Sequence, residues 1–171
     1  MTDVVSPPSI DLGPIDLETQ IDPGSPLLAL NNAHAEELSL LSAERMGRLV
    51  GEAFMAARFG EAHALLMAFD QDADYDSPNF IWFRDRYERF VYVDRVVVDP
   101  AQRGRGLARR LYEALFARAA DAGHTLVVCE VNAEPPNPAS DAFHAALGFT
   151  EVGQATLNRG KVVRYFARLL G

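Results

Sequence analysis

Hydrophobic and polar residues follow two different periods along this chain, and the two periods predict strands and helices in one mixed fold. Alternation with period two predicts half-buried strands, and apolar residues three or four positions apart predict helices. Helices are expected through the leucines at positions 27 to 41, from an N-cap at Ser42 to Phe54, from Gly106 to Ala122, and from an N-cap at Asn137 to Leu147. Strands are expected over Ile15–Ile21, Ala56–Phe59, Ala62–Phe69, Phe90–Val98, Thr125–Val131, Glu151–Leu157 and Val162–Leu169.

The length and composition predict a single globular domain. The chain has 171 residues, of which 49% are hydrophobic, enough to bury a core. Residues 1–14 are rich in Pro, Ser and Asp and are expected to form a loose tail, so the domain should cover residues 15–171. The only cysteine, Cys129, excludes an intrachain disulfide and any multi-cysteine metal site. Without a membrane-length apolar run or a basic signal peptide, we expect a cytoplasmic protein with no membrane partner.

The charge distribution argues against nucleic acid as a partner. The formal net charge is -8, and no Lys or Arg precedes Arg45. Such a chain repels nucleic acid and suits a cationic small molecule or a basic peptide, although solubility alone explains the charge equally well. The acidic loop Asp70–Asn79 has the Asp-x-Asp-x-Asp spacing of a calcium loop but lacks its Gly and distal Glu, so no metal is expected. The sequence leaves a homodimer open.

A strand, a glycine-bearing turn and a helix follow one another at the centre of the chain. The strand ends at Asp99-Pro100, two glycines follow at Gly104 and Gly106, and an apolar helical series begins at Leu107. Such a turn can direct several backbone N–H groups and a helix N-terminus toward one anion. Plain connections also have this form, so these residues alone predict an anion site without identifying the anion.

Two motifs together resemble the GNAT superfamily of acyl-CoA-dependent N-acetyltransferases. The turn from Arg103 to Ala108 matches the (Gln/Arg)-x-x-Gly-x-(Gly/Ala) signature of that family. The segment from Asn137 to Phe149 matches its Asn-x-x-Ala-x-x-(Leu/Phe)-Tyr-x-x-x-Gly-Phe pattern in spacing, with His144 at the Tyr position. The resemblance is specific over residues 90 to 150. It implies an α/β fold in which a mixed, mostly antiparallel sheet splays at the cofactor strand and carries helices on both faces.

The resemblance also implies how acetyl-CoA binds. In that family the turn amides hold the pyrophosphate, and the preceding strand carries a bulge and pairs with the pantetheine arm. Arginines in the turn screen phosphate charge or are simply solvated. The residues implied at the cofactor are Val96, Val97, Val98, Arg103, Gly104, Arg105, Gly106, Leu107, Ala108, Asn137 and Ser140.

Acetyl transfer to an amine needs a base for the ammonium and an acid for the leaving thiolate. Glu130 stands where related N-terminal-amine acetyltransferases carry the base, unless it is a rim residue bonded to the loop that contains Pro135 and Pro136. Asp94 is the competing base, or it pairs with Arg95 of a neighbouring chain or with an arginine of its own. His144 replaces the usual acid, shares that role with Ser140, leaves it to a water molecule, or is a buried or capping histidine. Cys129 alternates away from Glu130, which argues against an acyl-cysteine route.

The expected reaction is direct transfer of an acetyl group to a primary amine of a small molecule or peptide in a ternary complex. The alternative is a non-catalytic protein that binds or senses acyl-CoA. The acceptor is expected between the first helices, the loop before the cofactor strand and the last two strands. The candidates for contacting it are Asn31, Asn32, Glu36, Phe80 and Trp82.

Overall fold

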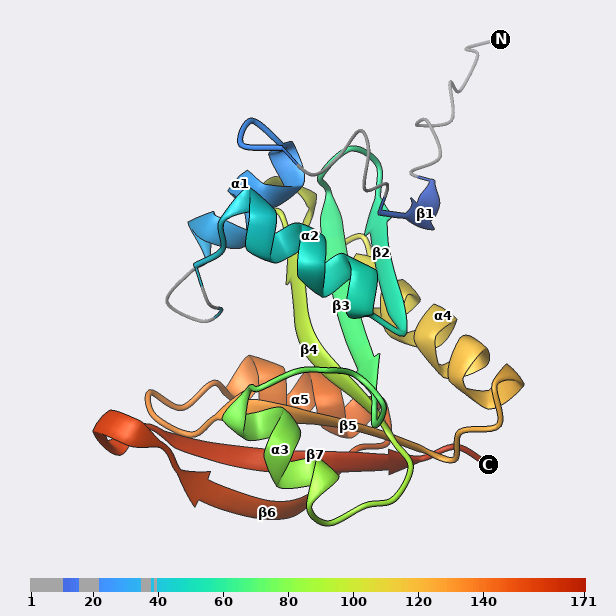
Figure 1. Ribbon diagram of the computed structural model, residues 1–171, viewed down its shortest axis with the longest axis vertical. Coiled ribbons are helices and arrows are strands. Elements are labelled where there is room, and N and C mark those ends of the chain that lie inside the picture. The colour runs from blue at the N-terminus through green and yellow to red at the C-terminus, as the bar shows by residue number, and fades with distance from the viewer. Residues whose placement is uncertain (1–10, 16–21, 35–37, 39) are drawn as a thin grey trace, which may run out of the picture.

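The computed structural model describes residues 11–15, 22–34, 38 and 40–171, and within them seven strands form one sheet in the order β1-β2-β3-β4-β5-β7-β6 (Figure 1). The strands are β1 (Leu12–Pro14), β2 (Met55–Phe59), β3 (Ala64–Asp70), β4 (Val91–Val98), β5 (Leu126–Asn132), β6 (Thr150–Thr156) and β7 (Val162–Leu169). The helices are α1 (Pro26–Ala33), α2 (Ala43–Glu52), α3 (Pro78–Arg84), α4 (Leu107–Asp121) and α5 (Pro138–Ala146), with short 3-10 turns η1 (Pro100–Gln102) and η2 (Asn158–Gly160).

The sheet splits between β4 and β5, which form its one parallel pair within the described residues. Their register covers only Val91–Val93 of β4 against Val127–Cys129 of β5, and beyond it the strands diverge. A bulge lies at the same point on the other side of β4, because Val93 pairs with Ala68 whereas Arg95 pairs with Met67. Asp94 is therefore the extra residue of the bulge. The predicted mixed sheet that splays at the cofactor strand is confirmed.

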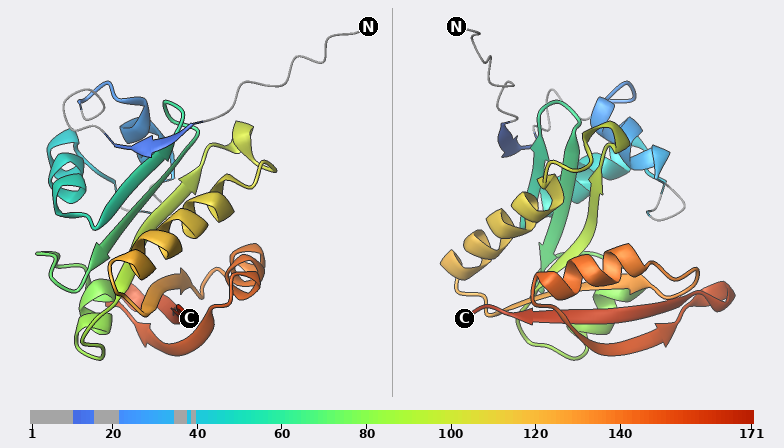
Figure 2. Two further views of the ribbon diagram at one scale, coloured as in Figure 1. Left: turned by 90° about the vertical axis from the view of Figure 1, so that its right-hand side faces the viewer. Right: turned by 180° about the vertical axis from the view of Figure 1, so that it is seen from behind.

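Helices cover both faces of the sheet, as expected. Figure 2 shows α1, α2 and α3 on one face and α4 and α5 on the other. Each face has its own core: Leu27, Met46 and Phe80 belong to the first, and Leu111 and Phe149 to the second. The strands between the two cores are nearly continuous apolar runs because both of their faces are buried. No helix of the described ranges is long and apolar enough to cross a membrane.

The N-terminal part departs from the sequence-based expectations. Leu12–Pro14 pairs with β2 although it falls in the predicted tail, so that expectation is wrong for these three residues. The strand predicted over Ile15–Ile21 lies mostly outside the described residues. The first helix ends at Ala33 rather than near Leu41. The Asn32 side chain accepts from the Leu41 N–H and donates to its C=O at 2.9 Å each, which holds Leu41 in a loop.

Local signals predicted the other helix boundaries well. The Ser42 hydroxyl accepts the Arg45 N–H at 3.1 Å, and Asn137 Oδ1 accepts the Ser140 N–H at 3.1 Å, so both N-caps are confirmed. Helix α3 was not expected, because its aromatic residues carry no regular period. It begins at Pro78, a residue that fits the first helical position.

Candidate active site

A cleft of about 140 Å³ opens where β4 and β5 diverge. It brings together three sequence-predicted residues that are far apart in the chain, Asp94, Glu130 and His144. The bulge and the splay together create it, because a regular sheet would fill this space with paired backbone. Its full lining is Leu38, Val93, Asp94, Arg95, Val96, Tyr112, Cys129, Glu130, Val131, Asn132, Asn137, Ser140 and His144.

Glu130 lies in β5 with its carboxylate turned into the protein. The residue is half-buried, yet its Oε2 is out of contact with solvent and makes no hydrogen bond of normal geometry with the described residues. Burial, and secondly the charge of Asp94, raises the pKa of Glu130 to about 8, although the nearby Tyr92 hydroxyl and Asn79 side chain partly offset the rise. A carboxylate with such a pKa is half-ionised under mildly basic conditions and can accept a proton there.

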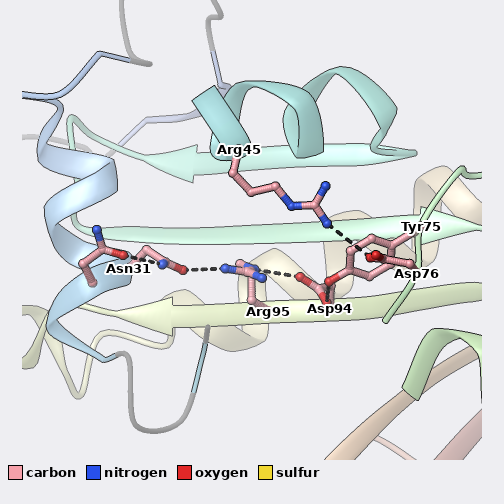
Figure 3. A network of polar contacts seen from close by, with 7 residues as sticks. Asn31, Arg45, Tyr75, Asp76, Asp94 and Arg95 are labelled. Carbon is pink, nitrogen blue, oxygen red and sulfur yellow. Dashed lines mark hydrogen bonds and ion pairs between the residues drawn. The ribbon is translucent and has the colours of Figure 1, made fainter. Parts of the chain in front are cut away.

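Asp94 uses both of its carboxylate oxygens in a buried network that crosses from β4 to α1 (Figure 3). Its Oδ1 accepts the Tyr75 hydroxyl at 2.6 Å, and its Oδ2 accepts Arg95 Nε at 2.7 Å. Arg95 also donates to Asn31 Oδ1 at 2.8 Å. Asp94 thus pairs with an arginine of its own chain, which was one of the alternatives. Both carboxylate oxygens of Asp94 are already bonded within the protein, whereas Glu130 Oε2 has no hydrogen-bond partner among the described residues.

His144 lies on α5 at the opposite side of the cleft and is 6% exposed. Its Nε2 is 2.9 Å from the Tyr112 hydroxyl, and its Nδ1 is 2.8 Å from the Ser140 carbonyl oxygen and 3.3 Å from the Ser140 hydroxyl. The rings of Phe143, Phe149 and Tyr112 stand edge-on around it. Burial lowers the pKa of His144, so the imidazole is neutral at pH 7.

The two sides of the cleft belong to opposite faces of the sheet. Glu130 neighbours Tyr92, which belongs to the core under α1, α2 and α3. Tyr112 and Cys129 belong to the core under α4. The cleft therefore offers a carboxylate from one face and a hydroxyl–imidazole pair from the other. Burial raises the pKa of the Cys129 thiol, which keeps it protonated and disfavours it as a nucleophile.

The glycine-bearing turn leads from β4 into α4, as the sequence predicts. Gly104 and Gly106 have φ angles of 82° and 70°, which favour glycine, and open space surrounds the position of a Cβ on either of them. No side chain of the described residues caps the first turn of α4, so its N–H groups face outward. Arg103 and Arg105 are exposed and form no ion pair within the described ranges.

The backbone beside this turn is also open. The edge of β4 that faces β5 has no strand partner over Asp94–Val98 among the described residues, so Val96, Val97 and Val98 lie on an unpaired edge. Leu107 is buried beneath the turn, and Ala108 follows it in the first helical turn of α4. Turn and edge together can accept an extended ligand with an anionic end.

The predicted acceptor residues have mostly structural positions. Phe80 is fully buried in the core, so its assignment to the acceptor surface does not hold. Asn31 is buried and holds Arg95, and Asn32 is committed to the loop at Leu41. Trp82 stacks on Tyr165 with ring centroids 4.1 Å apart. Glu36 lies outside the described residues.

Sequence reasoning missed Tyr112, Tyr92 and Arg95 as residues of the site. Tyr112 shares the apolar face of α4 with Leu111 and Leu115, so it reads as core. A hydroxyl within an otherwise aliphatic stripe was the available signal, since a buried Tyr usually finds a polar partner. No group of three or more side chains in the described ranges is arranged to hold a metal ion.

Comparison with known proteins identifies both a sequence family and structural relatives. The family described as "Acetyltransferase (GNAT) family" matches residues 15–149. No curated protein sequence matches. A chain of the NatC complex bound to Gag peptide and CoA superimposes with a TM-score of 0.72 at 13% identity, covering 95% of this chain and 99% of that one.

Two bacterial structures share the same fold. YncA from Salmonella typhimurium, solved with its cofactor acetyl-CoA, gives a TM-score of 0.69 at 17% identity and covers 95% of both chains. The ribosomal-protein-S18-alanine N-acetyltransferase from Escherichia coli gives 0.59 at 19% identity, covering 84% of this chain and 88% of that one.

Proposed function

Because the chain belongs to the acetyltransferase (GNAT) family, we propose that it transfers an acetyl group from acetyl-CoA directly to a primary amine bound in the same complex. The observation that carries the proposal is the position of Glu130. Its carboxylate lies in the cleft between β4 and β5, and its pKa is raised to about 8. A buried carboxylate without a full set of hydrogen bonds is costly to the fold, which points to a role in chemistry.

The residues around the cleft fit acetyl-CoA. The outward N–H groups at the start of α4 and the open space at Gly104 and Gly106 suit a pyrophosphate, and the arginines of the turn add positive charge. The unpaired edge of β4 suits the amide groups of a pantetheine arm. Acetyl-CoA supplies an acyl group activated as a thioester, and the protein supplies the binding, the orientation and the proton transfers. Neighbours of the same fold carry CoA or acetyl-CoA.

Glu130 acts as the base in this proposal. A primary ammonium has a pKa of about 10, so the amine needs a proton acceptor before or during attack. Asp94 contributes indirectly, because its charge helps raise the pKa of Glu130 while its own oxygens are bonded to Tyr75 and Arg95.

The acceptor is proposed to be the amine of a small molecule or of a peptide. A peptide is supported by two structural neighbours, one solved with Gag peptide and one described as acting on an alanine of ribosomal protein S18. The net charge of -8 favours acceptors that carry positive charge.

The test is CoA release from acetyl-CoA with a panel of amines and peptides, measured between pH 6 and 10. We expect kcat/KM to rise as Glu130 loses its proton, with a pKa of about 8. Glu130→Gln should lower the rate about 100-fold at neutral pH and less at high pH, where free amine accumulates. Glu88→Gln, on an exposed carboxylate, serves as the matched control. Tight acetyl-CoA binding without turnover on any acceptor would instead favour the acyl-CoA sensor.

A further inference from the structure

The hydrogen bonds of His144 define its tautomer. The Ser140 carbonyl oxygen can only accept, so Nδ1 at 2.8 Å carries the proton and donates it there. Nε2 is then unprotonated and accepts from the Tyr112 hydroxyl at 2.9 Å. In this state His144 has no N–H left for a ligand in the cleft. The structure therefore does not place His144 as the direct proton donor.

Tyr112 is the next group in the series of hydrogen bonds that runs through His144. Its hydroxyl is bonded to His144 and it lines the cleft beside Cys129 and Glu130. Ser140 lies at the other end, half-buried, with its hydroxyl 3.3 Å from Nδ1. The three side chains form a continuous row along the cleft, and each is within hydrogen-bonding distance of the next.

We infer that Ser140, His144 and Tyr112 form a proton wire whose last member, Tyr112, is the catalytic residue that protonates the departing CoA thiolate. The inference rests on the proposed function. It moves the acid from α5, where the family resemblance places it, to α4. His144 is a positioning residue that passes the proton on.

The proton balance follows from the row itself. The step begins from the other tautomer, in which Nε2–H donates to the Tyr112 oxygen and the Tyr112 O–H points at the sulfur. As the C–S bond breaks, its electron pair stays on sulfur, an S–H bond forms and the Tyr112 O–H bond breaks. The Tyr112 oxygen then takes the proton from Nε2 of His144, and Nδ1 takes the proton of the Ser140 hydroxyl. A water molecule reprotonates Ser140 and becomes hydroxide. The proton that the amine loses leaves through Glu130 and neutralises this hydroxide. The final arrangement, with Tyr112 donating to Nε2 and Nδ1–H facing Ser140, is the one that the structure holds. After CoA leaves, a water in the cleft gives a proton to the Tyr112 oxygen, the Tyr112 proton passes to Nε2, and the Nδ1 proton leaves through Ser140 to neutralise the hydroxide, which restores the starting tautomer.

The surroundings favour a wire of neutral groups. Burial raises the pKa of Tyr112 and lowers that of His144, so neither residue carries charge at rest. The charged or titratable groups that face the row are Cys129 and Glu130 of β5, near Tyr112, and Asp141 of α5, near His144. Asp141 is paired with Arg164 at 3.0 Å, which limits its effect.

The direct test uses CoA alone and requires no acceptor. The pKa of the bound CoA thiol is read from the ultraviolet absorbance of the thiolate in wild type and in Tyr112→Phe. A hydrogen bond to a charged group stabilises the thiolate, so the variant should raise the pKa of the bound thiol by about one to two units. Acetyl-CoA has no ionisable thiol and offers the hydroxyl no charged sulfur, so it should bind both proteins with affinities within about twofold. Tyr87→Phe, at a half-buried tyrosine outside the cleft lining, is the control.

A second measurement separates relay from positioning. Gln at position 144 can still accept from Tyr112 but cannot pass a proton between two ring nitrogens. We expect His144→Gln to lower kcat about 100-fold with little change in KM, and to replace a curved dependence of kcat on deuterium fraction by a linear one. An equal bound-thiol pKa in wild type and Tyr112→Phe, or full activity of His144→Gln, would overturn the wire. Either of these results would leave the proposed function standing. A wild-type protein that binds no CoA would overturn the proton wire and the proposed function together.

Discussion

Glu130→Gln should stabilise the fold while it lowers the rate of acetyl transfer. In the folded protein the pKa of Glu130 is raised from an ordinary 4.5 to about 8, first by burial and secondly by Asp94. Between these values the folded state holds more protons than the unfolded state, so the stability of the wild type falls as the pH rises through this window. Glutamine has a similar shape and does not ionise, so the variant escapes that loss.

The magnitude follows from the size of the shift. Each pH unit above the unfolded pKa costs the wild type ~1.4 kcal/mol, which reaches roughly 3 kcal/mol at neutral pH. Because Glu130 is only half-buried, we expect a smaller gain of about 2 kcal/mol for the variant. For a domain of this size that gain raises Tm by about 4–8 °C. Near pH 5 the gain should fall below ~1 kcal/mol, because little of the pH window has been crossed.

The assay is thermal unfolding of wild type and Glu130→Gln at pH 5 and pH 7.5 at constant ionic strength. Glu88→Gln is the control, since an exposed carboxylate should give the same small difference at both pH values. An equal Tm for wild type and Glu130→Gln at pH 7.5, or the same difference at both pH values, would refute the argument that burial raises the pKa of Glu130.

Three further substitutions test other parts of the account. Gly106→Val should weaken acetyl-CoA binding at least about tenfold. Its cost in stability should be about 1–2 kcal/mol, because a φ of 70° strains a valine although no atom lies within 4 Å of the Cβ position. Unchanged affinity by calorimetry would remove the turn from the binding site. Arg95→Met should lower the free energy of unfolding, measured by chemical denaturation, by about 3–5 kcal/mol, because it leaves the buried Asp94 carboxylate without its arginine. Adding Asp94→Asn should recover part of this loss, and no recovery would contradict the ion-pair argument. Gly153→Ala should lower the stability of the fold by about 1–3 kcal/mol and alter the near-ultraviolet circular dichroism, because the new Cβ would lie 2.6 Å from the Trp82 ring. An unchanged spectrum and stability would show that the ring moves freely.

Local sequence signals predicted what depends on a few adjacent residues. The cap at Asn137 and the turn at Gly106 follow from backbone requirements within one helical turn, and the structure has both. The spacing from Asn137 to Phe149 also singled out His144, which lines the cleft in the structure. The split sheet followed only from the family resemblance, since no local pattern specifies which strands diverge.

Long-range partners were beyond the sequence. The pairing of Arg95 with Asn31 joins residues 64 positions apart, and Tyr112 meets His144 across 32 positions. Alternation alone places Arg95 on the same face as Val93, whereas the bulge at Asp94 turns it to the opposite face, where it meets Asn31. The same shift in register commits Asp94 to contacts with Tyr75 and Arg95, which is why we propose Glu130 as the base.

The central claim is that the cleft between β4 and β5 binds acetyl-CoA with its thioester between Glu130 and Tyr112. A crystal structure of the complex with acetyl-CoA tests it most directly. We expect the pyrophosphate on the backbone amides of residues 103–108 and the acetyl group beside the Glu130 carboxylate. Acetyl-CoA bound outside the cleft, or an acetyl group that faces away from Glu130, would contradict it.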